Sequence, residues 1–257
     1  MELLYWSLRE SLSVRKNRSC LQFRRDDFFP ILFLHPAQRI FAIKSIHMKQ
    51  KWLLNLIGIC FLLSANGQTW TPLFNGKDFQ GWEHVGDGNF VIEDGLLKTQ
   101  GGMGLLWNTT QKFKNAKIKV VYKGAAENNA GVFIRIPKKP TEAWMPVNRG
   151  YEVQIDDRQD EFHRTGVLYS LTRAKASPGK AEGWNEMVIT LQGNRTLVEV
   201  NGVLVTDYQE GDPVPEKVKD YEPARRRRPK AGYIGLQNHG EEDVIYFKEV
   251  SYQKLKK

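Results

Sequence analysis

The chain is poor in cysteine and has no apolar run long enough to cross a bilayer. Its 257 residues include two cysteines, Cys20 and Cys60, which excludes a disulfide-rich scaffold and a zinc site built from four thiolates. The longest almost wholly apolar run, residues 52–63, is about a dozen residues, whereas a membrane-spanning helix needs about 20. A hydrophobic fraction of 41% and a charged fraction of 26% indicate a globular protein and argue against whole-chain disorder.

The motifs of several common enzyme classes are also missing. The chain has no nucleophilic-serine elbow, no Walker loop and no dinucleotide-binding fingerprint. It also lacks the His-x-His and His-Glu-x-x-His spacings of zinc sites, and it has no calcium-loop motif. The sequence therefore indicates no certain cofactor. A divalent cation that assists the reaction is one open alternative.

Residues 48–67 have the order of a secretory signal. Two positive charges, Lys49 and Lys51, precede the apolar run at 52–63, and small residues follow it. We expect cleavage after Gly67. The mature protein is then exported to the periplasm or out of the cell, with no stable membrane span.

The segment before this signal, residues 1–47, is interpreted as upstream sequence translated from a start codon chosen too early. The alternative is a real extension that makes the signal internal. Cys60 could suggest a lipoprotein, but the bulky Ile59 directly before it makes a poor lipidation signal. Residues 68–257 remain as a single predicted domain, because they contain no internal repeat and no break in composition.

The basic charge of the chain is unevenly distributed. Residues 1–67 contain ten Lys and Arg against four Asp and Glu, a net charge of +6 out of the +9 of the whole chain. The residues after Gly67 contain 28 and 25, a net charge of +3. The basic character thus belongs mostly to the segment that we expect to be removed, so we predict no nucleic-acid partner.

Short alternating runs dominate the predicted domain, and no long segment has the helical period. The expected strands are 90–92, 96–99, 104–107, 116–122, 131–136, 151–156, 166–169, 185–192, 197–200, 203–208, 232–237 and 244–253. Hairpin signals separate several of them, namely Asp94-Gly95, Gly193-Asn194 and Asn201-Gly202. So many short strands cannot form one flat sheet, so the sequence predicts an all-β sandwich or jelly roll of two stacked antiparallel sheets.

Two of the expected strands carry outward-facing polar groups. In the strand 151–156, the period of two places three polar residues on the face opposite the core: Glu152, Gln154 and Asp156. In the strand 131–136, the same period turns Phe133 and Arg135 outward and Ile136 inward. If the two strands are neighbours, a ring, a guanidinium and a carboxylate share one face, which would suit a sugar. The alternative is an ordinary solvated sheet face.

Two histidines lie at the ends of expected strands, and a run of arginines lies in an expected loop. His163 precedes the strand 166–169 and His239 follows the strand 232–237, and binding groups gather at strand ends. Each could be a general acid or base, or a metal ligand, although a lone histidine is more often structural. The expected surface loop 209–230 contains Arg225 to Arg228, which suits either an anion or polysaccharide contact or a solvated loop.

An ordered set of short motifs then covers almost all of residues 70–255. In chain order they are LFNGKDFQGW (73–82), FVIEDGLL (90–97), AGVFIR (130–135), GYEVQIDD (150–157), TGVLY (165–169), GWNE (183–186), VNG (200–202) and GLQNHG (235–240). This set resembles the 3-keto-disaccharide hydrolase family. The resemblance implies a concanavalin-like, lectin- or glucanase-type β-sandwich in an exported protein that acts on sugars oxidised at C3. It also implies that the polar row of 151–157 faces the ligand groove.

The candidate site follows from the resemblance together with the polar rows. The catalytic candidates are Glu152, His163, Arg135 and His239. The candidates for contact with a carbohydrate substrate are Gln154, Asp156, Phe133, Gln237 and Trp107.

Spacing argues against ordinary glycoside hydrolysis by two carboxylates. Glu152 and Asp156 are separated by about 13 Å along one strand, whereas the carboxyl pair of an ordinary glycosidase is about 5–9.5 Å apart. A 3-keto sugar allows another route, because its ketone acidifies the proton on C2, and the resulting enolate can expel the C1 substituent. In this hypothesis Glu152 or His163 is the base, and Arg135 with or without a divalent cation stabilises the enolate. His239 or Asp156 either positions the sugar or protonates the leaving group.

Two other functions are consistent with the same fold. A non-catalytic carbohydrate-binding module would share it, since fold does not fix function. Exposed tryptophans would then stack on sugar rings, although core positions are the more common place for tryptophan. An ordinary endoglucanase is less consistent, because the chain lacks a Glu-x-Asp-x-x-Glu signature.

Overall fold

The computed structural model describes residues 69–158 and 160–255. The predicted upstream segment 1–47, the predicted signal 48–67 and its cleavage point lie outside the described residues. Within the described part, no helix is both long enough and apolar enough to pass through a bilayer.

The described residues form two antiparallel sheets, which confirms the predicted all-β sandwich. The larger sheet has the order β11-β10-β9-β6-β13-β4-β3, with β1 paired to β13. Its strands are β1 (Thr71–Pro72), β3 (Asn89–Glu93), β4 (Leu96–Gln100), β6 (Asn115–Gly124), β9 (Asn185–Gln192), β10 (Arg195–Val200), β11 (Val203–Gln209) and β13 (Ile245–Lys254). The smaller sheet has the order β2-β5-β12-β7-β8, with β2 (Trp82–Gly86), β5 (Gly104–Asn108), β12 (Tyr233–Asn238), β7 (Ala130–Ile136) and β8 (Tyr151–Ile155).

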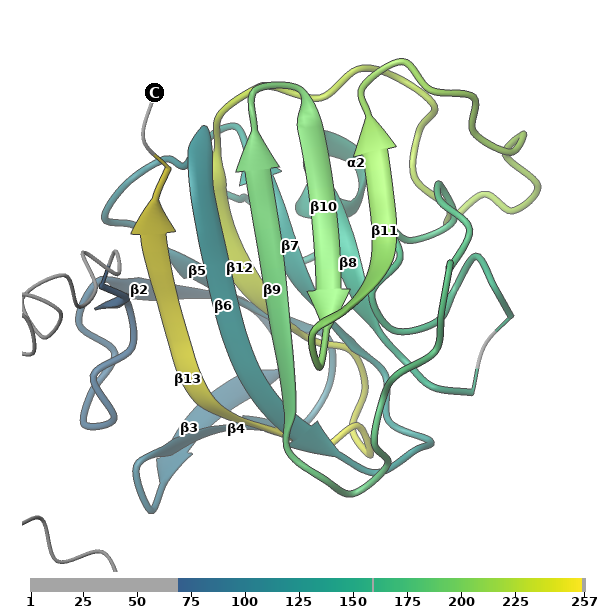
Figure 1. Cartoon of the computed structure of the whole chain (residues 1–257). Helices are drawn as coiled ribbons and strands as arrows, with labels where there is room; N and C mark the ends of the chain where they lie inside the picture. Colours follow the sequence, from purple (N-terminus) through teal and green to yellow (C-terminus); the bar gives the residue numbers. More distant parts are fainter. Residues whose placement is uncertain (1–68, 159, 256–257) are drawn as a thin grey trace, which may run out of the picture. The chain divides into compact units, whose positions relative to one another are not determined.

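The two sheets are stacked, and the main core lies between them. Figure 1 looks onto the outer face of the larger sheet, with β12, β7 and β8 of the smaller sheet behind it. Strand β6 shows how the sequence builds this layer, because buried and half-buried residues alternate along it from Ala116 to Tyr122. The alternating apolar set of β8, Tyr151, Val153 and Ile155, reaches the same core from the other sheet, as its period predicts.

Most expected strands are present, and the predicted hairpin turns are among the best confirmed features. Asp94-Gly95 and Asn201-Gly202 both have positive φ at each residue, 51° and 78° in the first pair and 51° and 77° in the second. The sequence analysis missed β1, β2 and the short helix α2 (Met145–Arg149). These pieces are short and lack a clear alternating pattern, which explains the omission.

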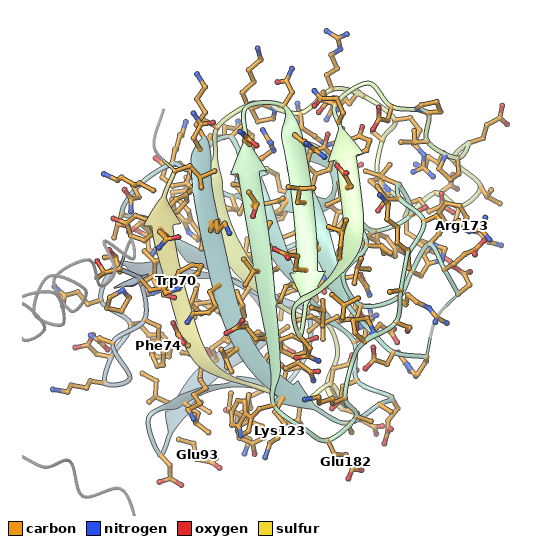
Figure 2. The ribbon with its side chains drawn as sticks, in the orientation of Figure 1. Trp70, Phe74, Glu93, Lys123, Arg173 and Glu182 are labelled. Carbon is orange, nitrogen blue, oxygen red and sulfur yellow. The ribbon has the colours of Figure 1, made fainter. Side chains whose placement is uncertain are left out.

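The expected strand 166–169 is not a regular strand. Its backbone accompanies the free edge of β8 through hydrogen bonds from Gln154 N to Val167 O (3.0 Å) and from Gly166 N to Gln154 O (2.9 Å). Tyr169 N also donates to Glu152 O at 3.0 Å. The long segment that contains it, between β8 and β9, runs along the outside of the fold, where Arg173 and Glu182 project outward (Figure 2).

A β-bulge in β7 overturns part of the predicted alternation. Phe133 pairs with Gly235 and Ile136 pairs with Tyr233, so β7 has one extra residue between these two pairs. The extra residue permits Arg135 a φ of 56°, and Ile136 consequently turns to the same side as Phe133. The expectation that Ile136 faces the inter-sheet core was therefore wrong.

The outer face of the smaller sheet is partly covered by its own apolar cluster. Leu105, Trp107, Phe133 and Ile136 from the sheet pack with residues of the α2 region: Ala143, Met145 and Val147. This cluster buries the apolar side of the outer face. The polar side chains of β8 and of the end of β12 lie beyond it and form the site described next.

Candidate functional site

Polar side chains of β12 and β8 lie on the outer face of the smaller sheet, and β7 runs between these two strands. Gly131 of β7 pairs with Gln154 of β8, and Leu236 of β12 pairs with Val132. The antiparallel register therefore places Gln237 on the other side of Gly131. In the neighbouring row, Glu152 pairs with Phe133, so the predicted adjacency of these two residues is confirmed.

Glu152 occupies the space that Gly131 leaves open. A Cβ at Gly131 would come within 2.8 Å of both Cγ and Oε1 of Glu152, so only glycine fits at this position without moving the carboxyl group. Glu152 is 5% exposed, and burial raises its pKa to about 8. The nearby Gln237 amide lowers the pKa in part, although its Nε2 and Oε1 have no well-aligned hydrogen-bond partner among the described residues. A carboxyl group with this pKa is mostly protonated at pH 7.

A cavity of about 560 Å³ opens beside this polar row. One wall of it is polar and includes four of the predicted site residues: Gln154, Asp156, His163 and His239. These residues come from β8, from the segment after β8 and from the end of β12, so the tertiary structure brings together groups that are far apart in the chain. The volume falls in the range of sites that bind small organic ligands.

Both histidines of the cavity are oriented by a carboxylate. Nδ1 of His163 lies 2.8 Å from Oδ1 of Asp160, and Nδ1 of His239 lies 2.9 Å from Oδ2 of Asp243. A carboxylate at Nδ1 favours the tautomer with its proton there and leaves Nε2 able to accept a proton. The His163 ring also packs edge-on against Tyr169, with 5.3 Å between the ring centroids. Each histidine thus has the arrangement of a general base or, when protonated, of a general acid.

Asn129, at the start of β7, joins the His239 side of the cavity to the polar row. Its backbone N donates to Oδ1 of Asp243 at 2.7 Å, and its side-chain Oδ1 accepts from Nε2 of Gln154 at 2.8 Å. The Asn129 amide NH₂ is thereby left as a donor at the cavity wall. Gln154 is 2% exposed, and its Oε1 has no partner among the described residues. A ligand hydroxyl would satisfy this buried acceptor.

Asp156 lines the cavity, but its charge is already matched. Arg158 donates to it through Nε (3.2 Å), Nη2 (3.1 Å) and its backbone N (3.0 Å). The Asp156 side chain is fully buried, and its bonds to Arg158 hold the ion pair in one geometry. This arrangement suits a fixed acceptor for a hydroxyl better than a proton carrier.

Arg135 is not near Glu152, contrary to the prediction. Because of the bulge, its side chain lies on the other side of the sheet and donates to Gly193 O (3.0 Å), Lys230 O (2.9 Å) and Thr196 Oγ1 (3.3 Å). Two of these partners belong to the hairpin between β9 and β10 in the larger sheet. Arg135 thus ties the two sheets together, and the predicted adjacency to an enolate site was wrong.

Four other candidates do not line the cavity. Phe133 is fully buried in the apolar cluster of the outer face, and Trp107 packs edge-on against Tyr233 in the same cluster, with 5.1 Å between centroids. Glu152 and Gln237 are buried and are absent from the cavity lining.

The described residues do not fit a resident metal ion. Nowhere in the described ranges do three or more His, Cys, Asp or Glu side chains gather closely enough to hold one. The two histidines of the cavity are each bonded to their own aspartate instead. The proposed mechanism therefore assigns no step to a cation.

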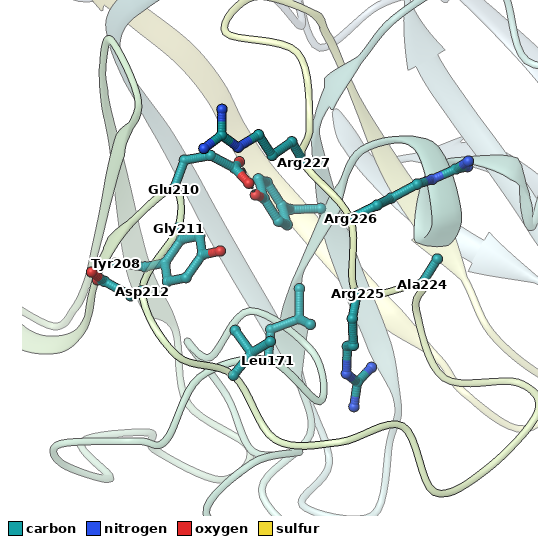
Figure 3. A pocket seen from close by; sticks show the side chains of 11 residues that line it. Leu171, Tyr208, Glu210, Gly211, Asp212, Ala224, Arg225, Arg226 and Arg227 are labelled. Carbon is teal, nitrogen blue, oxygen red and sulfur yellow. Dashed lines mark hydrogen bonds between the residues drawn. The ribbon is translucent and has the colours of Figure 1, made fainter.

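The arginine run has a mainly structural role. Arg228 is buried and donates to Gly150 O (2.6 Å) and Ala224 O (2.8 Å), and Arg225 is bonded to Glu222 at 2.8 Å. Figure 3 shows the small pocket beside the run, about 140 Å³, with Arg226 extending away from it. Arg225 and Arg228 fit neither an anion or polysaccharide contact nor a solvated loop, because their hydrogen bonds hold the loop itself in place.

The sequence analysis missed Asn129 and Tyr169 as cavity residues. Each lies at the end of a segment paired with β8 or β12, and binding groups gather at such ends, so the strand pattern could have indicated both. The residues 218–222 were missed for a different reason. They belong to a long loop without periodicity, and no local pattern places that loop over a sheet face.

The fold and the cavity define a two-sheet β-sandwich domain with a largely polar cavity of ligand size on the outer face of its smaller sheet. The chain belongs to the 3-keto-alpha-glucoside-1,2-lyase-like domain family, whose family model matches residues 69–254. This confirms the resemblance seen in the motifs.

Solved structures from Parabacteroides distasonis ATCC 8503 share the fold. Two of them, provisionally described as glycosyl hydrolases, are each 22% identical to this chain, with TM-scores of 0.59 and 0.60. Each alignment covers 73% of this chain, and they cover 94% and 100% of the respective relatives. No curated protein sequence is significantly similar to this chain.

Proposed function

We propose that the protein is an exported enzyme that cleaves the glycosidic bond of 3-keto-glycosides, including 3-keto-disaccharides, by elimination across C1 and C2. The observation that carries the proposal is a single cavity in which two carboxylate-bonded histidines lie beside the polar row of β8. The family description, a 1,2-lyase acting on a 3-keto-glucoside, supports the same bond and the same kind of reaction.

The reaction needs one base, one acid and a donor for a transient oxyanion. His163 Nε2 removes the proton from C2, and the C–H electron pair forms an enolate with its charge on the C3 oxygen. The carbonyl then re-forms, the C1–C2 double bond is made, and the bond from C1 to the leaving oxygen breaks. His239 Nε2 donates a proton to that oxygen. Addition of water across the C1–C2 double bond would complete a net hydrolysis.

The remaining roles fall to the polar wall. Asn129 replaces Arg135 as the group that stabilises the enolate oxygen, because its amide NH₂ is oriented by the bond from Gln154 to its Oδ1. Gln154 Oε1 and the Asp156 carboxylate accept from sugar hydroxyls. Glu152 stays outside the cavity lining as a buried, uncharged carboxyl group that keeps the row in place.

The first experiment separates an enzyme from a binding module. The wild-type protein is incubated with a disaccharide oxidised at C3 and with the unoxidised disaccharide, and released sugar is measured. We expect release from the oxidised sugar alone. Binding of the oxidised sugar without release would favour the lectin-like module. Deuterium at C2 should slow the reaction when chemistry is rate-limiting, and an absent isotope effect would argue for direct displacement.

The second experiment assigns the two proton transfers. His163→Gln should lower turnover by about 10²–10⁴-fold with every aglycone, because it removes the base. His239→Gln should do so with a poor leaving group such as an alcohol but much less with 4-nitrophenol, which leaves without a proton. His84→Gln is the matched control, since His84 is an exposed histidine of β2 that does not line the cavity. Equal losses for both aglycones in His239→Gln would contradict its role as the acid.

A further inference from the structure

One part of the cavity lining differs in character from the polar row. The loop between β11 and β12 contributes two apolar side chains to the lining, Val218 and Tyr221, together with the charged Lys219 and Glu222. These are the two most exposed large hydrophobic side chains among the described residues, at 78% and 57% exposure. Apolar side chains held together in water at the mouth of a cavity are typical of a surface that a ligand covers.

Polar side chains of the loop order the backbone that carries Val218. Glu222, which is 5% exposed, accepts hydrogen bonds from the backbone N of Val218 and of Lys219, each at 3.2 Å. Arg225 completes the arrangement by bonding to Glu222 at 2.8 Å and to Pro215 O at 2.8 Å. The backbone around Val218 is therefore ordered by hydrogen bonds, which limits the backbone entropy lost when a ligand binds beside it.

We propose that Val218 and Tyr221 form a platform for an apolar, aromatic aglycone, so that the preferred substrates are aryl 3-keto-glycosides. This rests on the proposed function, which places the oxidised sugar on the polar wall. The leaving oxygen on C1 then lies at His239 Nε2, and the rest of the aglycone extends from it toward the loop. A flat ring would stack on Tyr221 and contact Val218, whereas a small alkyl aglycone would leave both in water.

The test compares two substrates that share the 3-keto-glucosyl group, one with a phenyl and one with a methyl aglycone. Tyr221→Ala should raise KM for the phenyl substrate by about 5-fold and leave KM for the methyl substrate nearly unchanged. Tyr221→Phe keeps the ring face and should restore the wild-type value. Val218→Thr should have a smaller effect of the same kind, and Val203→Thr is its control, since Val203 is exposed at the β10–β11 hairpin away from the cavity.

The outcomes separate this proposal from the proposed function. Equal changes for both substrates, or no change for either, would overturn the platform while leaving the elimination intact. If the wild type releases no sugar from either substrate, the proposed function fails. Calorimetric binding of the phenyl and methyl compounds then decides the platform by itself: a phenyl preference that Tyr221→Ala abolishes supports it, and equal binding of both compounds rejects it.

Discussion

Glu152 shows how a single residue can carry a different role from the one its type suggests. A carboxylate on a sheet face beside a polar cavity is an obvious base, yet the Glu152 carboxyl lies over Gly131 and is not part of the cavity lining. Burial raises its pKa to about 8, so folding favours its protonated form. The histidines line the cavity, and their Nε2 atoms make no hydrogen bond within the described ranges, so they are better placed to move protons.

The raised pKa of Glu152 gives a prediction about stability. Below the ordinary carboxyl pKa, the group is protonated in both the folded and the unfolded protein. Between that pKa and about 8, the folded protein retains a proton that the unfolded chain has lost. The free energy of unfolding should therefore fall by up to about 1.4 kcal/mol for each pH unit in this window, and level off above it.

Glu152→Gln should remove this decline, because the amide does not titrate. Urea unfolding of the wild type and the variant between pH 5 and 9 measures it, with Glu186→Gln on the exposed side of β9 as the control. The variant should gain stability relative to the wild type as the pH rises. Parallel curves for Glu152→Gln and the wild type would contradict the assignment of a buried, protonated carboxyl.

At the scale of the element, the bulge in β7 decides which side chains reach the site. Regular alternation would place Arg135 with Phe133 on the outer face. The extra residue turns Arg135 inward, where it satisfies backbone carbonyls of the β9–β10 hairpin and of the loop before β12. The bulge also needs Gly232, since a Cβ there would lie 2.2 Å from the Arg135 carbonyl carbon. The strand alternation of β8, which has no bulge, was predicted correctly.

The bulge can be tested with a pair of substitutions. Arg135→Ala and Arg135→Gly both delete the guanidinium and leave carbonyls unpaired, so each should destabilise the protein by about 3 kcal/mol or more. Because Arg135 has a φ of 56°, the glycine variant should be the more stable of the two by about 1 kcal/mol. Denaturant unfolding measures both, and turnover per folded molecule should be unchanged. An alanine variant as stable as the glycine variant would contradict the strained backbone.

At the scale of the whole molecule, the site depends on how the sheets and loops are layered. The inter-sheet core fixes the smaller sheet, the α2 region covers the apolar part of its outer face, and the loop between β11 and β12 lines part of the cavity. The charge of the chain is unevenly distributed along it. The residues after Gly67 have a net charge of only +3, which suits the neutral sugar that we propose as substrate.

The proposed export can be tested directly. Expression of the full chain in a bacterial host with a periplasm should yield a secreted or periplasmic form that begins at Gln68, because small residues at 65 and 67 suit signal peptidase. N-terminal sequencing of the purified protein reads the cleavage site. Substitution of Gly67 by a bulky residue such as Trp should block cleavage there, and an unprocessed wild-type chain in the cytoplasm would contradict the prediction.

The sequence by itself determined most of the strands, the tight hairpins, the family and the identity of the polar row on β8, because each depends on local periodicity, turn chemistry or ordered motifs. Only the tertiary structure decided that Arg135 leaves the site, that Glu152 is buried outside the cavity lining, and that His163 and His239 share one cavity with Val218 and Tyr221. Bulges, burial and the docking of long loops depend on contacts between residues far apart in the chain, and a local pattern contains no record of those contacts.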